Sequence, residues 1–143
     1  MADVFDTANY ILERCGPMTT MKLQKLVYYS QAWSTVWDDD VIFPEAIEAW
    51  QNGPVVRELW QDTKGRFRID TVSKGASTNL TVVQKETIDR VLGFYGNKDA
   101  QWLSDLTHME EPWNLAMNEG QNTEILPAWL VEYYSSIAPA EQA

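Results

Sequence analysis

Helix start and stop signals divide this sequence into short amphipathic stretches, and this punctuation limits the possible folds more than any other feature. Asp3, Thr81 and Asp99 each stand where a side chain can cap a helix, and Gly16 and Gly96 stand where helices end. Only brief extended runs lie between the helical stretches. The pattern therefore predicts a mainly α, compact single-domain helical fold with a small two- or three-stranded β element.

The first two helices are predicted over residues 4–15 and 20–37. Apolar residues recur with helical spacing in the first, which places Cys15 on its buried face. The second carries an apolar stripe and is expected to be the central helix of the fold. This stripe consists of Leu23, Leu26, Val27, Ser30, Trp33 and Trp37, and Lys22, Lys25 and Tyr29 lie off it.

The middle of the chain is predicted to hold the β element. Residues 41–43 and 47–50 are predicted as two brief strands, and the alternation over 66–72 is typical of a half-buried strand that pairs with them in one sheet. Between these segments, Pro54 is expected at the first position of a third helix whose inward face includes Trp60. Further helices are predicted over 81–96, 99–106, 112–120 and 127–134.

The chain is short and acidic. Its 143 residues favour one domain, predicted over 1–138 with a short tail at 139–143. The 11 Lys and Arg against 21 Asp and Glu give a net charge of -10, which disfavours nucleic acid as a partner because phosphate contacts need clustered cations. Residues 101–143 hold seven acidic and no basic residues, which form either a solvated surface or a docking face for a basic protein.

The composition also disfavours several kinds of chemistry. One Cys and one His cannot form a conventional zinc site, and residues 38–40 are better explained as a helix-ending turn than as a cation site, so no metal or other cofactor is expected. Phosphate-binding loops and nucleophile motifs are absent from the sequence. No apolar stretch is long enough to span a membrane and the N-terminus lacks a signal-peptide pattern, so the cytoplasm is the expected location.

The aromatic content indicates recognition of a protein. Seven Trp, six Tyr and four Phe are more than one small core readily buries, so some are expected at the surface. Exposed aromatic side chains are typical of protein interfaces. Each single aromatic residue can equally belong to the core.

Four blocks of the sequence form an ordered set of motifs. The first is MKLQKLVYYSQAW, from Met21 to Trp33. The second is IEAWQNGPV, from Ile47 to Val55, and it is followed by the capped helix at 81–96 and by the pattern LTH with Pro-Trp at 106–113. In this order, over residues from about 17 to 116, the blocks resemble the Panacea domain family, the SocA-like and GepA-like antitoxins of bacterial and phage toxin–antitoxin systems.

The resemblance implies a function as well as a mainly helical fold. It implies no enzymatic activity, no catalytic residues, and neutralisation of a cognate protein toxin, encoded nearby, by direct binding. The alternative is an interaction protein of a phage, prophage or other mobile element that inhibits a host or defence factor or acts as a proteolytic adaptor. A remote alternative is a small hydrolase or transferase that uses His108 with Glu110 or Lys25. A monomer or a weak homodimer is expected.

The candidate partner-binding residues come mainly from these motifs. The polar row on the second predicted helix is hard to explain by packing alone, because it suits either a buried network with Thr107 and His108 or the floor of a groove. The candidates for the toxin interface are Lys22, Lys25, Tyr29, Trp50, Asn52, Pro54, Arg57, His108, Glu110 and Trp113.

Overall fold

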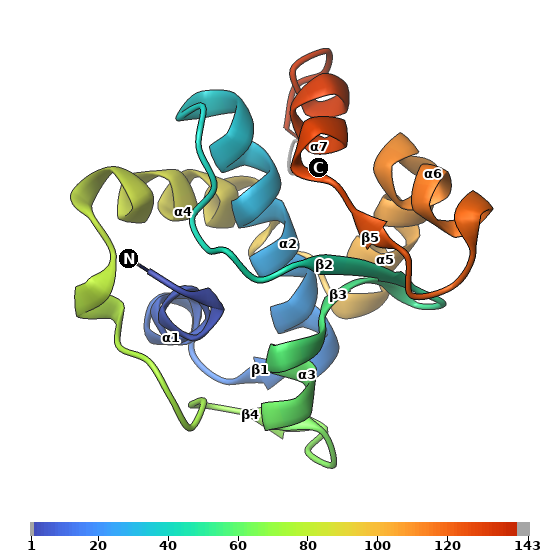
Figure 1. The fold of residues 1–143 in the computed structure, drawn as a ribbon. Helices are drawn as coiled ribbons and strands as arrows, with labels where there is room; N and C mark the ends of the chain where they lie inside the picture. Colours follow the sequence, from blue (N-terminus) through green and yellow to red (C-terminus); the bar gives the residue numbers. More distant parts are fainter. Residues whose placement is uncertain (1, 140–143) are drawn as a thin grey trace.

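The computed structural model describes residues 2–139, which fold into seven α-helices and five short strands (Figure 1). The prediction of a mainly helical fold with a small β element is confirmed. Residues 140–143 of the predicted tail lie outside the described residues. The helices are α1 (Val4–Cys15), α2 (Thr20–Trp37), α3 (Arg57–Thr63), α4 (Val82–Tyr95), α5 (Ala100–Met109), α6 (Glu111–Glu119) and α7 (Pro127–Tyr134), and the strands are β1 (Met18–Thr19), β2 (Ile47–Trp50), β3 (Gly53–Val56), β4 (Arg68–Ile69) and β5 (Glu124–Ile125).

The α2 helix passes through the centre of the molecule, as its sequence predicts, and packs against α1, α4, α5 and α7 (Figure 1). Every residue from Leu23 to Thr35 is buried, so all sides of this helix are covered over about three turns. The predicted apolar stripe accounts for only part of these contacts. Polar side chains such as Lys25 and Gln31 are buried as well, and they need partners inside the protein.

The β2 and β3 strands form an antiparallel hairpin in which Trp50 pairs with Gly53, and β5 lies on the other edge of β2. Pro54 is part of β3, so the prediction that it begins a helix is wrong: that helix, α3, begins at Arg57. Proline is tolerated here because β3 is an edge strand. Gly53 has a φ of 121°, a left-handed conformation that side chains disfavour, and the hairpin turn depends on it.

A second, separate sheet consists of β1 and β4, with Met18 opposite Ile69. The prediction that residues 66–72 join the hairpin in one sheet is therefore wrong, and only two of these residues form a strand. The third strand of the hairpin sheet is β5 instead. With two residues it is too short to show the alternation by which a strand is recognised in a sequence.

Residues 41–43 form no strand, contrary to the sequence prediction. The buried side chain of Gln31 takes the place of a neighbouring strand. Its amide oxygen accepts a hydrogen bond from the Ile42 N–H at 2.7 Å, and its amide nitrogen donates to the Phe43 carbonyl at 2.8 Å. These two bonds pair the Ile42 N–H and the Phe43 carbonyl without a neighbouring strand.

Side chains cap four helices. Asp3, Thr19, Thr81 and Asp99 each accept a hydrogen bond from the backbone N–H three residues further on, at 2.8–3.1 Å. The caps predicted at Asp3, Thr81 and Asp99 are therefore confirmed.

The prediction that Cys15 lies on the buried face of α1 is wrong. Cys15 is exposed because it belongs to the final turn of α1, beyond Ile11 and Leu12, which are the last buried residues of that helix. Within residues 2–139, no helix combines the length and apolar character that crossing a membrane requires.

Candidate functional site

The sequence blocks that carry the family resemblance meet in space around α2 and the hairpin. The indole N–H of Trp113, in α6, donates to the carbonyl of Trp50, at the end of β2, at 2.8 Å. The hydroxyl of Tyr29, in α2, donates to the carboxyl group of Glu110 at 2.7 Å. These contacts define two parts of the site: a buried cluster around Glu110 and a partly exposed group of aromatic side chains beside the hairpin.

Glu110 is the centre of the buried cluster. It is 5% exposed, and one of its carboxyl oxygens accepts hydrogen bonds from the hydroxyls of Tyr29 and Tyr134, both at 2.7 Å. The Tyr134 hydroxyl has a single proton and donates it to Glu110, so its contact with the Tyr28 hydroxyl at 2.9 Å is a bond that Tyr28 donates. The four side chains form one chain of hydrogen bonds that joins α2, α7 and the start of α6.

Burial sets the protonation of this cluster. Burial raises the pKa of Glu110 to about 7, although the two tyrosine hydroxyls act in the opposite direction. Burial also raises the pKa values of Tyr29 and Tyr134 well above the ordinary range, so both hydroxyls keep their protons. Glu110 is therefore a buried carboxyl group that titrates near neutral pH.

The free energy of unfolding should fall as the pH rises through the titration of Glu110. Because folding raises this pKa from 4.5 to about 7, the protonated acid stabilises the fold below pH 4.5, and this contribution is lost as the pH rises through about 7. The loss amounts to roughly 3 kcal/mol. Chemical denaturation of the wild type and of Glu110→Gln at several pH values measures it, since glutamine keeps an acceptor but does not ionise. Equal pH slopes for the two proteins would contradict the prediction.

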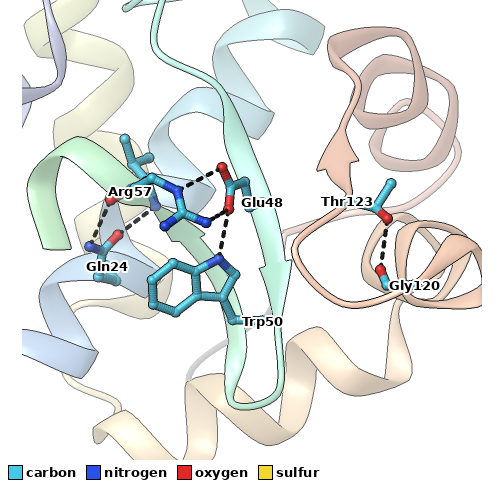
Figure 2. A network of polar contacts seen from close by, with 7 residues as sticks. Gln24, Glu48, Trp50, Arg57, Gly120 and Thr123 are labelled. Atoms are coloured by element: carbon cyan, nitrogen blue, oxygen red, sulfur yellow. Dashed lines mark hydrogen bonds and ion pairs between the residues drawn. The ribbon is translucent and has the colours of Figure 1, made fainter. Parts of the chain in front are cut away.

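Glu48 organises the side chains on the outer side of the hairpin (Figure 2). Its carboxylate pairs with the Arg57 guanidinium at 2.8 Å and accepts a hydrogen bond from the Trp50 indole N–H at 2.9 Å. Burial raises the pKa of Glu48, but the hydrogen bonds from Arg57 and Trp50 outweigh burial and hold this pKa below its ordinary value. The Arg57 guanidinium also lies 5.3 Å from the centre of the Trp50 ring, within reach of a cation–π contact. The ring of Trp50 is thus held at its N–H and against its face.

Gln24 holds the other strand of the hairpin from inside the protein. Its amide oxygen accepts a hydrogen bond from the Val56 N–H at 2.9 Å, and its amide nitrogen donates to the Val56 carbonyl at 3.2 Å (Figure 2). Gln24 is 5% exposed, so both bonds lie in the interior. On this edge strand, the side chain supplies the pairing that a further strand would give.

Lys25 is a buried cation. It is 1% exposed, and its ammonium group donates a hydrogen bond to the Pro54 carbonyl at 3.3 Å. Burial lowers the pKa of Lys25 to about 8. Gly53 makes room for this side chain, because a Cβ at that position would stand 2.5 Å from Cε of Lys25. The close approach of the hairpin to α2 therefore depends on glycine.

Lys25→Met should raise the free energy of unfolding near neutral pH by roughly 1–3 kcal/mol, because methionine fills similar space without a buried charge. Folding lowers the pKa of Lys25 from 10.5 to about 8, so the wild type should gain stability as the pH rises from about 8 to 10.5, where the unfolded chain holds the extra proton. The variant should lack this gain. Denaturation curves at neutral and alkaline pH provide the measurement, and a variant less stable than the wild type at neutral pH would contradict the prediction.

Four ring side chains beside the hairpin form two contacting pairs, joined by one hydrogen bond to the backbone of Trp50, and we call the four together the aromatic row. Trp60, in α3, meets Trp50 edge to face with 5.2 Å between ring centres. Trp113 is bonded to the backbone of Trp50, and the ring of His108 lies 4.2 Å from that of Trp113. Trp60 is 38% exposed and the other three are partly exposed. The aromatic row is therefore a surface feature with fixed geometry.

The structure separates the predicted interface residues by accessibility. Lys25, Tyr29, Pro54 and Glu110 are buried, so their side chains do not lie on the protein's surface, and their part in a toxin interface stays a prediction. Lys22 is half-buried, and its ammonium group donates to the Gly96 carbonyl at 2.7 Å. The accessible candidates are Trp50, Asn52, Arg57, His108 and Trp113.

The arrangement that an enzymatic alternative needs is not assembled in the described part of the chain. Nε2 of His108 is buried and has no hydrogen-bond partner among residues 2–139. Glu110 is bonded to two tyrosines and Lys25 to a backbone carbonyl, so neither group is placed to activate His108. No three His, Cys, Asp or Glu side chains within the same residues are grouped to hold a metal ion.

Two residues of the site, Glu48 and Trp60, are not among the sequence candidates. The predicted helix from Pro54 puts Trp60 on an inward face, which is wrong because α3 begins at Arg57 and leaves Trp60 exposed. Glu48 could have been found, since it stands two positions before Trp50 on a predicted strand and so shares its face. The signal for Trp60 is weaker because it depends on where the helix starts.

The site lies within a stretch of the chain that matches a known family. Residues 23–114 match the family described as "Antitoxin SocA-like, Panacea domain". No curated protein and no solved structure matches the chain. The matched stretch includes the whole aromatic row, Gln24, Lys25 and Glu110, and it covers more than half of the chain. The protein therefore belongs to the Panacea domain family of SocA-like antitoxins.

Proposed function

We propose that this protein is an antitoxin without enzymatic activity that neutralises a cognate protein toxin by binding it directly through the aromatic row. Membership of the family supports a role in a toxin–antitoxin system. The choice of binding face rests on the aromatic row, which is partly exposed and lies entirely within the matched stretch. Tryptophan side chains in such positions are the usual anchors of protein interfaces.

The aromatic row is already held in place before any partner arrives. Glu48 and Arg57 fix the ring of Trp50, and the Trp50 carbonyl fixes the indole of Trp113. Side chains that are ordered in the free protein lose less conformational entropy on binding. More of the free energy gained by burying the rings therefore remains as affinity.

Charge supports a basic toxin as the partner. In residues 101–139 the exposed charged side chains are all acidic, and Glu111 and Glu119 stand at the two ends of α6, the helix that carries Trp113. Charges of one sign around a docking face speed the approach of an oppositely charged partner. The exposed acidic residues are Asp105, Glu111, Glu119, Glu124 and Glu132.

Replacing Glu111 and Glu119 with glutamine together should slow association with the toxin several-fold at low salt and weaken its salt dependence. The dissociation rate should change little, because exposed charges contribute little to affinity after contact. Surface plasmon resonance at several salt concentrations separates the two rates. A change confined to the dissociation rate would contradict electrostatic steering by this helix.

Co-expression with the neighbouring gene tests the proposed function. Expression of that gene alone should arrest growth, co-expression with this protein should relieve the arrest, and the two proteins should purify as a complex. His108 belongs to the aromatic row, so folded His108→Ala should lose relief of the arrest only to the extent that it weakens the complex. Relief of growth arrest without a complex, or loss of relief with the complex intact, would contradict neutralisation by binding.

A further inference from the structure

A cavity of about 330 Å³ lies between α2, the hairpin and α3, next to the aromatic row. The indoles of Trp50 and Trp60 form part of its wall, and the buried Lys25 lines it as well. Other lining residues, Thr20, Gln24 and Asn52, carry polar side chains. The cavity thus combines two large apolar surfaces with a cation.

Lys25 is the feature of this cavity that indicates a ligand. It is 1% exposed, and its ammonium group has three N–H donors, of which one is used within residues 2–139, in a long 3.3 Å bond to the Pro54 carbonyl. Burial alone lowers the pKa of Lys25 to about 8, with no carboxylate acting against it. A buried cation with unused donors is stabilised when an anion comes into contact with it.

The lining of the cavity has the opposite character to the rest of the protein. The chain has a net charge of -10, yet no Asp or Glu among the described residues lines this cavity. Glu48, the acidic residue of the neighbouring hairpin face, is already paired with Arg57 at 2.8 Å. The cavity lining therefore provides no anion to pair with Lys25, so a charge partner must come from another molecule.

We propose that this cavity binds a carboxylate attached to an apolar body, with the ammonium group of Lys25 as its charge partner and Trp50 and Trp60 against the apolar part. One ammonium group balances one carboxylate. A phosphate monoester carries close to two negative charges at neutral pH and would leave a buried excess of negative charge in an acidic protein. The carboxylate belongs either to a free organic acid or to the toxin, and the second source rests on the proposed function.

Benzoate, a flat ring with one carboxylate, is a suitable probe for the isolated protein. In protein with ¹³C-labelled lysine, millimolar benzoate should shift the Lys25 side-chain signal and the indole signals of Trp50 and Trp60 along one saturable curve. It should also raise the pKa of Lys25 above about 8, because a carboxylate favours the charged ammonium. Inorganic phosphate should bind more weakly than benzoate.

Two variants make this test specific. Lys25→Met should abolish saturable benzoate binding, whereas Lys98→Met, which removes the lysine 4.7 Å from the ring of Trp102, should leave it unchanged. Absence of a saturable shift in the wild type, or full benzoate binding by folded Lys25→Met, would overturn the proposal. Stronger binding of phosphate than of benzoate would overturn the assignment of the ligand as a carboxylate. The wild-type titration decides the matter even if Lys25→Met does not fold.

Titration of the toxin into wild-type and Lys25→Met antitoxin distinguishes the two sources of the carboxylate. If the toxin supplies it, Lys25→Met should weaken the complex by about tenfold or more. If a free organic acid is the ligand, Lys25→Met should leave toxin affinity unchanged, while benzoate still competes with the toxin for Trp50 and Trp60. Both results support the carboxylate site. The benzoate experiment needs no toxin, so it still tests the carboxylate site if the proposed antitoxin function is wrong.

Discussion

Trp60→Ala is expected to lower affinity for the toxin by at least 30-fold, which corresponds to roughly 2 kcal/mol. Trp60 lies edge to face against Trp50 and presents a large apolar surface that a partner would bury. Because only 38% of Trp60 is exposed in the free protein, the substitution should also lower the free energy of unfolding, by roughly 2–3 kcal/mol. Isothermal titration and chemical denaturation measure the two effects separately.

Trp102 provides the matched control for Trp60. It has the same exposed fraction, 38%, but it lies on α5 beside Lys98 and is not part of the aromatic row. Trp102→Ala should therefore keep toxin affinity within about twofold. Equal losses in the two variants, or normal affinity in both, would show that the interface lies elsewhere.

Gln24→Ala should lower the free energy of unfolding by roughly 2–5 kcal/mol. The substitution leaves the N–H and the carbonyl of Val56 without the partners that Gln24 provides at 2.9 and 3.2 Å, at a position where Gln24 is only 5% exposed. It also loosens β3, the strand that leads into α3 and Trp60. We therefore expect the folded fraction of Gln24→Ala to bind the toxin more weakly than the wild type does.

Gln51→Ala is the control for this prediction. Gln51 is exposed in the hairpin turn and lines the same cavity as Gln24. Its replacement should change the free energy of unfolding by no more than about 0.5 kcal/mol. A Gln24→Ala variant as stable as Gln51→Ala would show that the two hydrogen bonds to Val56 do not hold the hairpin.

The helices could be predicted because their signals are local. Asp3, Thr81 and Asp99 each bond to a backbone N–H three residues away, and this contact needs no information about the rest of the fold. The central place of α2 could be predicted as well, from its length and its apolar stripe.

The β element could be predicted only in outline because its pairing is not local. The Gly-Pro pair at Gly53 fits a helix start as well as a hairpin turn. The segment is held as a strand by the hydrogen bonds between Val56 and Gln24, which lies 32 positions earlier in the sequence. Within residues 66–72, the strand Arg68–Ile69 pairs with Met18–Thr19. No periodicity in the sequence indicates that Met18–Thr19 is a strand.

The candidate site could be predicted in part. The motif blocks converge in space, as the hydrogen bond between Trp113 and the Trp50 carbonyl shows. The burial of Tyr29 and Glu110 could not be predicted, because a helical stripe reveals one packed face and α2 is packed on all sides. Their bond is a tertiary contact between positions 81 residues apart.

Direct binding through the aromatic row can be decided by following the indole N–H signals of the tryptophans while unlabelled toxin is added to ¹⁵N-labelled antitoxin. The signals of Trp50, Trp60 and Trp113 should shift or broaden with the fraction of toxin bound, while the signal of Trp102 stays in place. Changes at Trp102 alone, or a neutralising complex that leaves the three row signals unchanged, would contradict binding through this face.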